Sequence, residues 1–91
     1  MDANTKLKRS VDVTYQVVAE EAILIRMSTG TYFSLNPIGT EFWNILDGQQ
    51  TLQHHATITA AKYNVEVARV VADFLELADK MRVDDLVEIV A

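Results

Sequence analysis

The sequence has no cysteine, three glycines, one proline and no apolar stretch longer than four residues. Without cysteine there is no disulfide, no thiolate metal site and no thiol nucleophile, and secreted domains this small more often carry disulfides. Apolar stretches this short form neither a membrane span nor a signal-peptide core. We therefore predict a cytoplasmic protein that makes no membrane contact.

Basic side chains are also scarce beyond the first ten residues. Residues 10–91 carry five basic and twelve acidic side chains, a net charge of minus seven, whereas residues 1–9 carry three basic and one acidic. This pattern predicts a flexible basic tail over residues 1–10 and a single domain over residues 11–91. An acidic domain repels phosphate backbones, which argues against nucleic acid as a partner.

Two segments predict the start of an antiparallel sheet. VTYQVV at 13–18 alternates apolar and polar residues, which is typical of a strand. AILIRM at 22–27 is apolar on nearly both sides. It predicts a central strand covered on both faces, although a short apolar run is also compatible with a buried helix.

A third strand is expected over residues 32–35. The preceding STGT provides turn residues, with Gly30 free to adopt a positive φ. In YFSL, Phe33 and Leu35 point to one face and Tyr32 to the other, because side chains alternate along a strand. In a three-stranded meander, one edge of this strand has no partner. Tyr32 is expected either to pack or to contact a partner.

Three helices and a small C-terminal hairpin are expected to follow. Asn36 and Pro37 are typical of a helix start, Thr51 of a second, and Asn64 of the second helix's end. The third helix is predicted at about 66–81. The expected buried residues of the three helices are Ile38, Phe42, Trp43, Ile45 and Leu46; Leu52, Ala56, Ala60 and Tyr63; and Val67, Val70, Val71, Phe74, Leu77, Ala78 and Met81. Gly48 is expected as a helix C-cap, and Asp84 and Asp85 as the hairpin turn.

This order of elements predicts an α+β fold. It is a winged helix-turn-helix domain with an N-terminal three-stranded antiparallel sheet, three helices and a small C-terminal β wing. Winged helices often bind DNA through the last helix. Here that helix and its ends carry four acidic against three basic residues, so it lacks the positive charge that phosphate binding needs.

Catalytic chemistry finds little support in the sequence. His54 and His55 are adjacent, and neighbours on a helix point about 100° apart, so they cannot share a metal. We expect both to be partly exposed helix residues. The three glycines are far apart and form no phosphate loop. We therefore predict that the protein is not an enzyme and has no metal or cofactor.

The unpaired edge at residues 31–35, next to a long apolar helix, favours peptide binding. Backbone groups on such an edge pair with an extended peptide, and the helix provides side-chain pockets. Alternatively, the N-terminal tail or a second copy covers the edge. The oligomeric state expected is therefore a monomer or an edge-strand dimer.

The segment ILIRMSTGTYFSLNPIGTEFWNIL, followed by KYNV and VVADFLELADKMRV, resembles the PqqD-like family. These small proteins are recognition elements for precursors of ribosomally synthesised and post-translationally modified peptides (RiPPs). They include the pyrroloquinoline quinone chaperone and stand-alone leader-binding proteins of lasso peptide clusters. The resemblance extends from about residue 12 to 90. Its most specific part is formed by Tyr32, Phe33, Leu35, Asn36, Gly39 and Trp43.

The resemblance implies that the leader of a precursor peptide adds as a strand beside the third strand and lies against the third helix. It implies a backbone edge formed by Thr31, Tyr32, Phe33, Ser34 and Leu35. It also implies apolar pockets lined by Val67, Val70, Val71 and Phe74. Asp73 or Glu76 would meet a basic leader residue. We expect at least two of the four apolar helix residues to be ordinary core.

The function implied is non-catalytic delivery of the leader to a leader peptidase or modifying enzyme, with a lasso peptide cluster favoured. An alternative is a pyrroloquinoline quinone-type precursor chaperone for a radical SAM enzyme. A winged-helix DNA-binding regulator is a distant third hypothesis.

Overall fold

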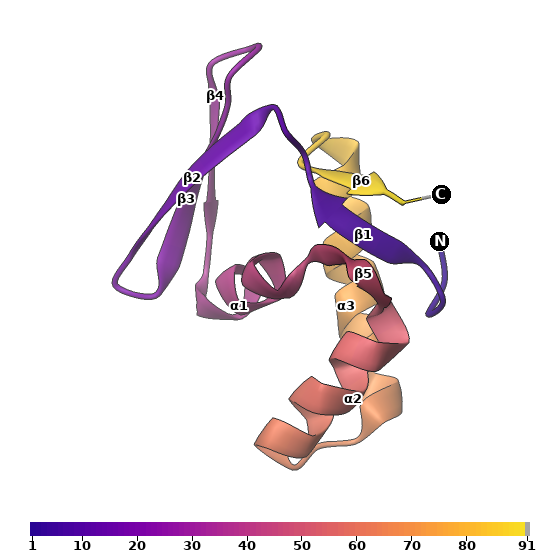
Figure 1. Ribbon diagram of the computed structural model, residues 1–91. Coiled ribbons are helices and arrows are strands. Elements are labelled where there is room, and N and C mark those ends of the chain that lie inside the picture. The colour runs from indigo at the N-terminus through magenta and orange to yellow at the C-terminus, as the bar shows by residue number, and fades with distance from the viewer. Residues whose placement is uncertain (91) are drawn as a thin grey trace.

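The computed structural model describes residues 1–90 and arranges six strands and three helices in two sheets with helices between and beside them (Figure 1). The elements are β1 (Lys6–Arg9), β2 (Val13–Val18), β3 (Glu21–Arg26), β4 (Thr31–Leu35), α1 (Pro37–Ile45), β5 (Asp47–Thr51), α2 (Leu52–Tyr63), α3 (Val67–Val83) and β6 (Val87–Ile89).

The first sheet has the order β2-β3-β4, and both pairings are antiparallel. Its inner face packs on the core, where Ala22 and Leu24 of β3 are fully buried. The outer face is open, and Ile23 is 45% exposed. The predicted three-stranded sheet is thus confirmed. The prediction that its central strand is covered on both faces is wrong, because the helices pack against the inner face alone.

The second sheet has the order β5-β1-β6, with β1 in the centre. Leu7 of β1 is 1% exposed and pairs with Ile89 of β6. The prediction of a flexible tail over residues 1–10 is therefore wrong for residues 6–9. Leu7 is the only apolar residue in Lys6–Arg9, so the segment has the composition of a solvated tail, but that one leucine enters the core.

The C-terminal segment also differs from the predicted hairpin. Asp85 takes a positive φ of 55°, and the Leu86 N–H donates to the Met81 carbonyl at 2.9 Å, so a tight turn ends α3. The turn at 84–85 is confirmed. The following strand β6, however, pairs with β1 and not with a neighbouring segment. The C-terminal wing is thus a single strand of the second sheet.

The helix starts form as the sequence predicts. The Asn36 Oδ1 atom accepts from the Gly39 N–H at 2.8 Å, and Pro37 occupies the first turn of α1. The Thr51 hydroxyl accepts from the His54 N–H at 3.1 Å and caps α2. Asn64 ends α2 with a left-handed φ of 54°. These signals are short-range, which explains why the sequence reveals them.

The end of α1 differs from the prediction that Gly48 caps it. Gly48 has a φ of 72° but lies within β5, and α1 ends at Ile45 with Leu46 as its C-cap. The Arg9 Nη1 atom donates to the carbonyls of Trp43 and Asn44, both at 3.2 Å. The end of β1 thus satisfies two carbonyls in the last turn of α1, where a cation also complements the helix dipole.

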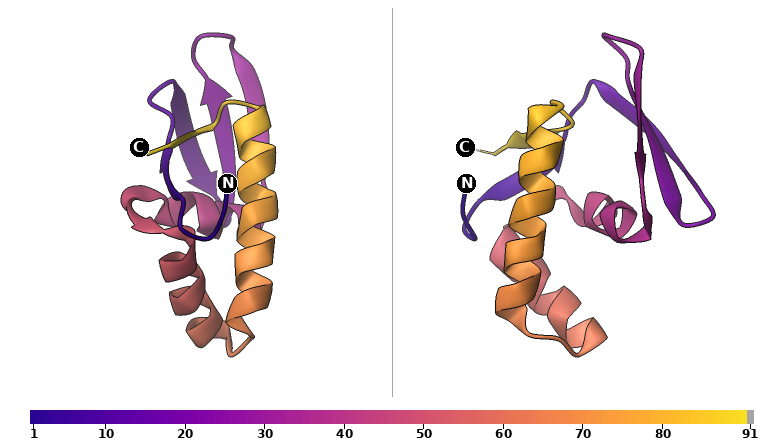
Figure 2. Two further views of the ribbon diagram at one scale, coloured as in Figure 1. Left: turned by 90° about the vertical axis from the view of Figure 1, so that its right-hand side faces the viewer. Right: turned by 180° about the vertical axis from the view of Figure 1, so that it is seen from behind.

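Helix α1 lies between the first sheet on one side and α2 and α3 on the other (Figures 1 and 2). Its Trp43 is fully buried and meets the Tyr15 ring of β2 edge to face, with the centroids 5.5 Å apart. On the other side the Phe42 and Phe74 rings are 4.8 Å apart. These contacts confirm that Phe42, Trp43 and Phe74 are core residues and hold the first sheet against the helices.

Candidate binding surface

The first part of the candidate surface is the free edge of β4. Within residues 1–90, β4 pairs with β3 alone, so its second edge has no strand partner. Tyr32 lies on the outer face and is 70% exposed, whereas Phe33 and Leu35 are partly buried against the core. The alternative in which the N-terminal tail covers this edge is wrong, because β1 belongs to the second sheet. The edge predicted at residues 31–35 is therefore present and open.

The second part is an open groove of about 940 Å³ on the helical side of the molecule. Its walls are formed by α1, the end of α2, residues 69–77 of α3 and, at one side, Val17 and Glu20; Pro37 and Ile38 in this lining follow closely after β4 in the chain. Apolar side chains dominate the lining. They are Val17, Pro37, Ile38, Phe42, Ile45, Val65, Val70, Phe74 and Leu77.

Three of the helix residues implied by the family resemblance line this groove, namely Val70, Asp73 and Phe74. Val67 and Val71 are only partly buried, pack against the core and do not line the groove. Helix α3 therefore presents two apolar faces, and the groove uses one of them.

Glu76 does not line the groove either. Its carboxylate lies 3.3 Å from the Lys80 ammonium one turn later, and both side chains are well exposed. A pair of this kind contributes little to stability and is typical of a solvated helix face. Of the two acidic candidates, Asp73 is the one that faces the groove.

The sequence reasoning missed Ile38 and Arg69 as groove residues. Ile38 was expected in the core of α1, but it is 70% exposed and lines the groove. Arg69 lies one turn before Asp73 and also lines the groove. Within residues 1–90 neither Arg69 nor Asp73 takes part in an ion pair. The sequence signal for Arg69 was its position one helical turn before Asp73, beside Val70 and Phe74.

Part of the groove lining is a polar cluster of Glu41, Lys62 and Tyr63. The Glu41 carboxylate of α1 accepts from the Tyr63 hydroxyl at 2.6 Å and from the Lys62 ammonium at 3.0 Å. The Tyr63 hydrogen bond is the main cause that lowers the pKa of Glu41, and the bond to Glu41 raises the pKa of Lys62. Tyr63 is 52% exposed, so the prediction that it belongs to the core is wrong.

The histidines lie away from both parts of this surface. His54 is exposed, but His55 is 8% exposed, which corrects the prediction that both are partly exposed. Burial lowers the pKa of His55, and Asp47, whose Oδ1 lies 3.6 Å from the His55 Nε2, opposes this shift. Residues 1–90 contain no cluster of three or more side chains suited to hold a metal ion.

None of the helices in residues 1–90 combines the length and apolar character needed to cross a membrane.

The predicted α+β architecture is confirmed as a three-stranded antiparallel sheet, three helices and a C-terminal strand. Fold and surface together define a small domain with an open strand edge and an adjoining apolar groove. The chain belongs to the PqqD family, because the model of that family, described as coenzyme PQQ synthesis protein D (PqqD), matches residues 21–87.

A solved structure described as TbiB1 in complex with the TbiA(beta) leader peptide is also similar. It superimposes with a TM-score of 0.80 at 26% sequence identity, over 89% of this chain and 94% of that one. No curated protein sequence matches the chain.

Proposed function

We propose that this protein binds the leader segment of a ribosomally synthesised precursor peptide. The leader adds as a strand to the free edge of β4 and places apolar side chains in the groove. The observation that carries the proposal is the free five-residue edge of β4 together with an apolar groove lined by Pro37 and Ile38, which follow β4 in the chain. The similarity to TbiB1, which was solved with a leader peptide, supports it.

The two parts of the surface contribute differently to binding. Backbone hydrogen bonds to β4 provide affinity that depends little on the peptide sequence, and side-chain pockets provide specificity. In the groove, Val70 and Phe74 form an apolar wall, and Asp73 is placed to meet a basic leader residue. The backbone of Thr31, Tyr32, Phe33, Ser34 and Leu35 forms the edge.

The bound leader is delivered to an enzyme in the cytoplasm, and this protein itself performs no catalysis. Holding the leader on a domain that docks to an enzyme replaces a bimolecular encounter with a local one at high effective concentration. We propose a leader peptidase or modifying enzyme as the partner and favour lasso peptide biosynthesis. The second candidate, a chaperone that presents a precursor for quinone cofactor synthesis, is favoured by the match to the PqqD family model.

The test is a titration followed by fluorescence anisotropy. The probe is the fluorescein-labelled leader of the precursor peptide encoded beside this chain. We expect saturable binding, with a loss of at least tenfold in affinity for Ile38→Asp, because a carboxylate would then lie in the apolar groove. Ile38 is 70% exposed, so this variant should fold.

The matched control is Ile58→Asp. Ile58 is 57% exposed on α2 and does not line the groove. The control should bind like the wild type. Equal binding by all three proteins would remove the groove from the proposal, and no binding of any neighbouring leader to the wild type would refute the proposal itself.

A further inference from the structure

The inner face of the first sheet carries one charged residue. The β-sheet register places Val13, Tyr15 and Val17 of β2 beside Arg26, Leu24 and Ala22 of β3. The same register continues through Thr31, Phe33 and Leu35 of β4. Because directly opposed residues share a face, these nine residues form three rows that end at the free edge of β4. Two rows are apolar there, and the third joins Arg26 to Thr31.

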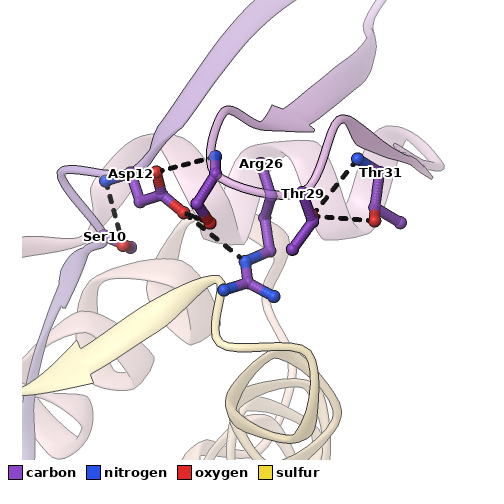
Figure 3. A network of polar contacts seen from close by, with 6 residues as sticks. Ser10, Asp12, Arg26, Thr29 and Thr31 are labelled. Atoms are coloured by element: carbon purple, nitrogen blue, oxygen red, sulfur yellow. Dashed lines mark hydrogen bonds and ion pairs between the residues drawn. The ribbon is translucent and has the colours of Figure 1, made fainter.

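Arg26 forms an ion pair with Asp12 but no hydrogen bond to it. Its Nε atom lies 3.7 Å from the Asp12 Oδ2 atom, beyond hydrogen-bond length, and this buried Nε has no hydrogen-bond partner within residues 1–90. The Asp12 carboxylate accepts instead from the backbone N–H and the hydroxyl of Ser28. Figure 3 shows the two terminal guanidinium nitrogens pointing away from Asp12. Among the side-chain hydrogen bonds of residues 1–90, none involves these two nitrogens.

Thr31 is the one residue between Arg26 and the free edge in their row of the sheet. It is the residue directly opposite Arg26, it is exposed, and its side chain is short. Its hydroxyl and that of Thr29 lie 2.8 Å apart and form a local pair (Figure 3). A strand added to β4 lies about 10 Å from β3, two strand spacings away. The long arginine side chain spans much of this distance, and a peptide side chain covers the rest.

We infer that Arg26 selects an acidic residue in the bound peptide, at the position opposite Thr31. This inference rests on the proposed function and specifies the sequence it recognises. A planar guanidinium with free donors matches a carboxylate better than any other peptide group. The partner is thus a peptide with one carboxylate at a fixed place, although the domain itself is acidic.

The same rows determine the rest of the pattern. Residues opposite Leu35 and Phe33 face apolar rows, so they are apolar. Every pairing in this sheet is antiparallel. A peptide strand that pairs antiparallel with β4 has its N-terminal end beside Leu35 and its C-terminal end beside Thr31. The recognised segment then reads, from its N-terminus, apolar, any residue, apolar, any residue, Asp or Glu.

The experiment combines one protein variant with one peptide variant. The probe is again the fluorescein-labelled leader of the precursor encoded beside this chain. The peptide variant is the same leader with its acidic residue in this pattern replaced by the corresponding amide. We expect Arg26→Gln and the peptide substitution each to weaken binding about tenfold. Combined, they should cost little more than either alone, because both remove the same contact.

Two controls separate recognition from folding. Lys6→Gln removes one exposed charge from the other sheet and should leave binding unchanged. Arg26→Glu should bind poorly to the natural leader and regain affinity for a leader whose acidic residue is replaced by Arg. A misfolded variant would show no such rescue.

Wild-type affinity retained by Arg26→Gln, or a tightly bound leader without an acidic residue in this pattern, would overturn the inference and leave the proposed function intact. A wild type that binds no leader would overturn both.

Discussion

The two sheets of the molecule have the same number of strands but differ in how their edges are finished. The sheet β2-β3-β4 joins neighbouring segments in an unbroken register and has two regular edges, the six-residue β2 and the five-residue β4. The sheet β5-β1-β6 joins three distant segments. Its register shifts between Lys6 and Lys8, and β6 has three residues. Irregular and short edges discourage further pairing, whereas a long regular edge invites it. The regular free edges therefore belong to β2-β3-β4, the sheet on which the proposed function depends.

The largest effect on stability is expected in the sheet β5-β1-β6. Leu7→Ala removes most of a side chain that is 1% exposed at the centre of β5-β1-β6. We expect the free energy of unfolding to fall by about 2–5 kcal/mol, the usual range for such a cavity. Urea denaturation measures it. Val11→Ala, at a residue 83% exposed, is the control and should change stability by less than about 0.5 kcal/mol. A similar small change for Leu7→Ala would mean that residues 6–9 are a tail after all.

The next largest effect is expected on leader affinity, through the free edge of β4. N-methylation of the leader, one residue at a time, removes one backbone donor in each peptide. We expect every second methyl group within the paired segment to weaken binding about tenfold, because N–H groups point alternately towards and away from β4. Anisotropy titration of the series measures this. A series without a period of two would contradict strand addition.

A smaller effect on stability is expected where Arg9 of β1 contacts the end of α1. Arg9→Met keeps the apolar stem but removes the donor to the Trp43 and Asn44 carbonyls. We expect a loss of about 1 kcal/mol in the free energy of unfolding, typical of a lost helix-end hydrogen bond. Lys8→Met serves as the control, because Lys8 is exposed on the same strand. Equal stability of the Arg9 variant and the control would show that the arginine is dispensable.

The smallest effect is expected at Glu41, in the polar part of the groove lining. The Tyr63 hydrogen bond lowers the pKa of Glu41 below its ordinary value of 4.5 in the folded protein. A carboxyl with a lowered folded pKa stabilises the fold above its unfolded pKa, and this contribution disappears as the pH falls through the folded value. The wild type should therefore be slightly more stable than Glu41→Gln at pH 7, and this difference should shrink as the pH is lowered to 3. Thermal unfolding at both pH values checks this, and an unchanged difference at pH 3 would rule out the carboxylate as the cause.

Local sequence signals predicted the strands of the first sheet and the starts of α1 and α2 well. The alternation in 13–18 and the caps at Asn36 and Thr51 depend on residues within a few positions, and the structure confirms them. The second sheet could not be predicted, because Leu7 finds its partner Ile89 at the other end of the chain. A strand with one apolar residue gives no periodic signal.

The groove was only partly predictable for a related reason. The spacing in α3 shows a broad apolar face, but it does not show which part of that face meets α2 and which part stays open. Val70 and Phe74 line the groove, whereas Val67 and Val71 pack elsewhere. Isoleucine is usually a core residue, so the sequence alone places Ile38 in the core. Its exposed position depends on how α1 packs against the rest of the fold.

The most direct test of the central claim is amide hydrogen exchange of residues 31–35, measured with and without the leader. Residues 87–89 of the short edge strand β6 provide the internal reference. Strand addition predicts that alternate amides of β4 become protected by at least about tenfold, because they gain a backbone partner, while β6 is unchanged. Leader binding that leaves every β4 amide exchanging at its free rate would contradict the account.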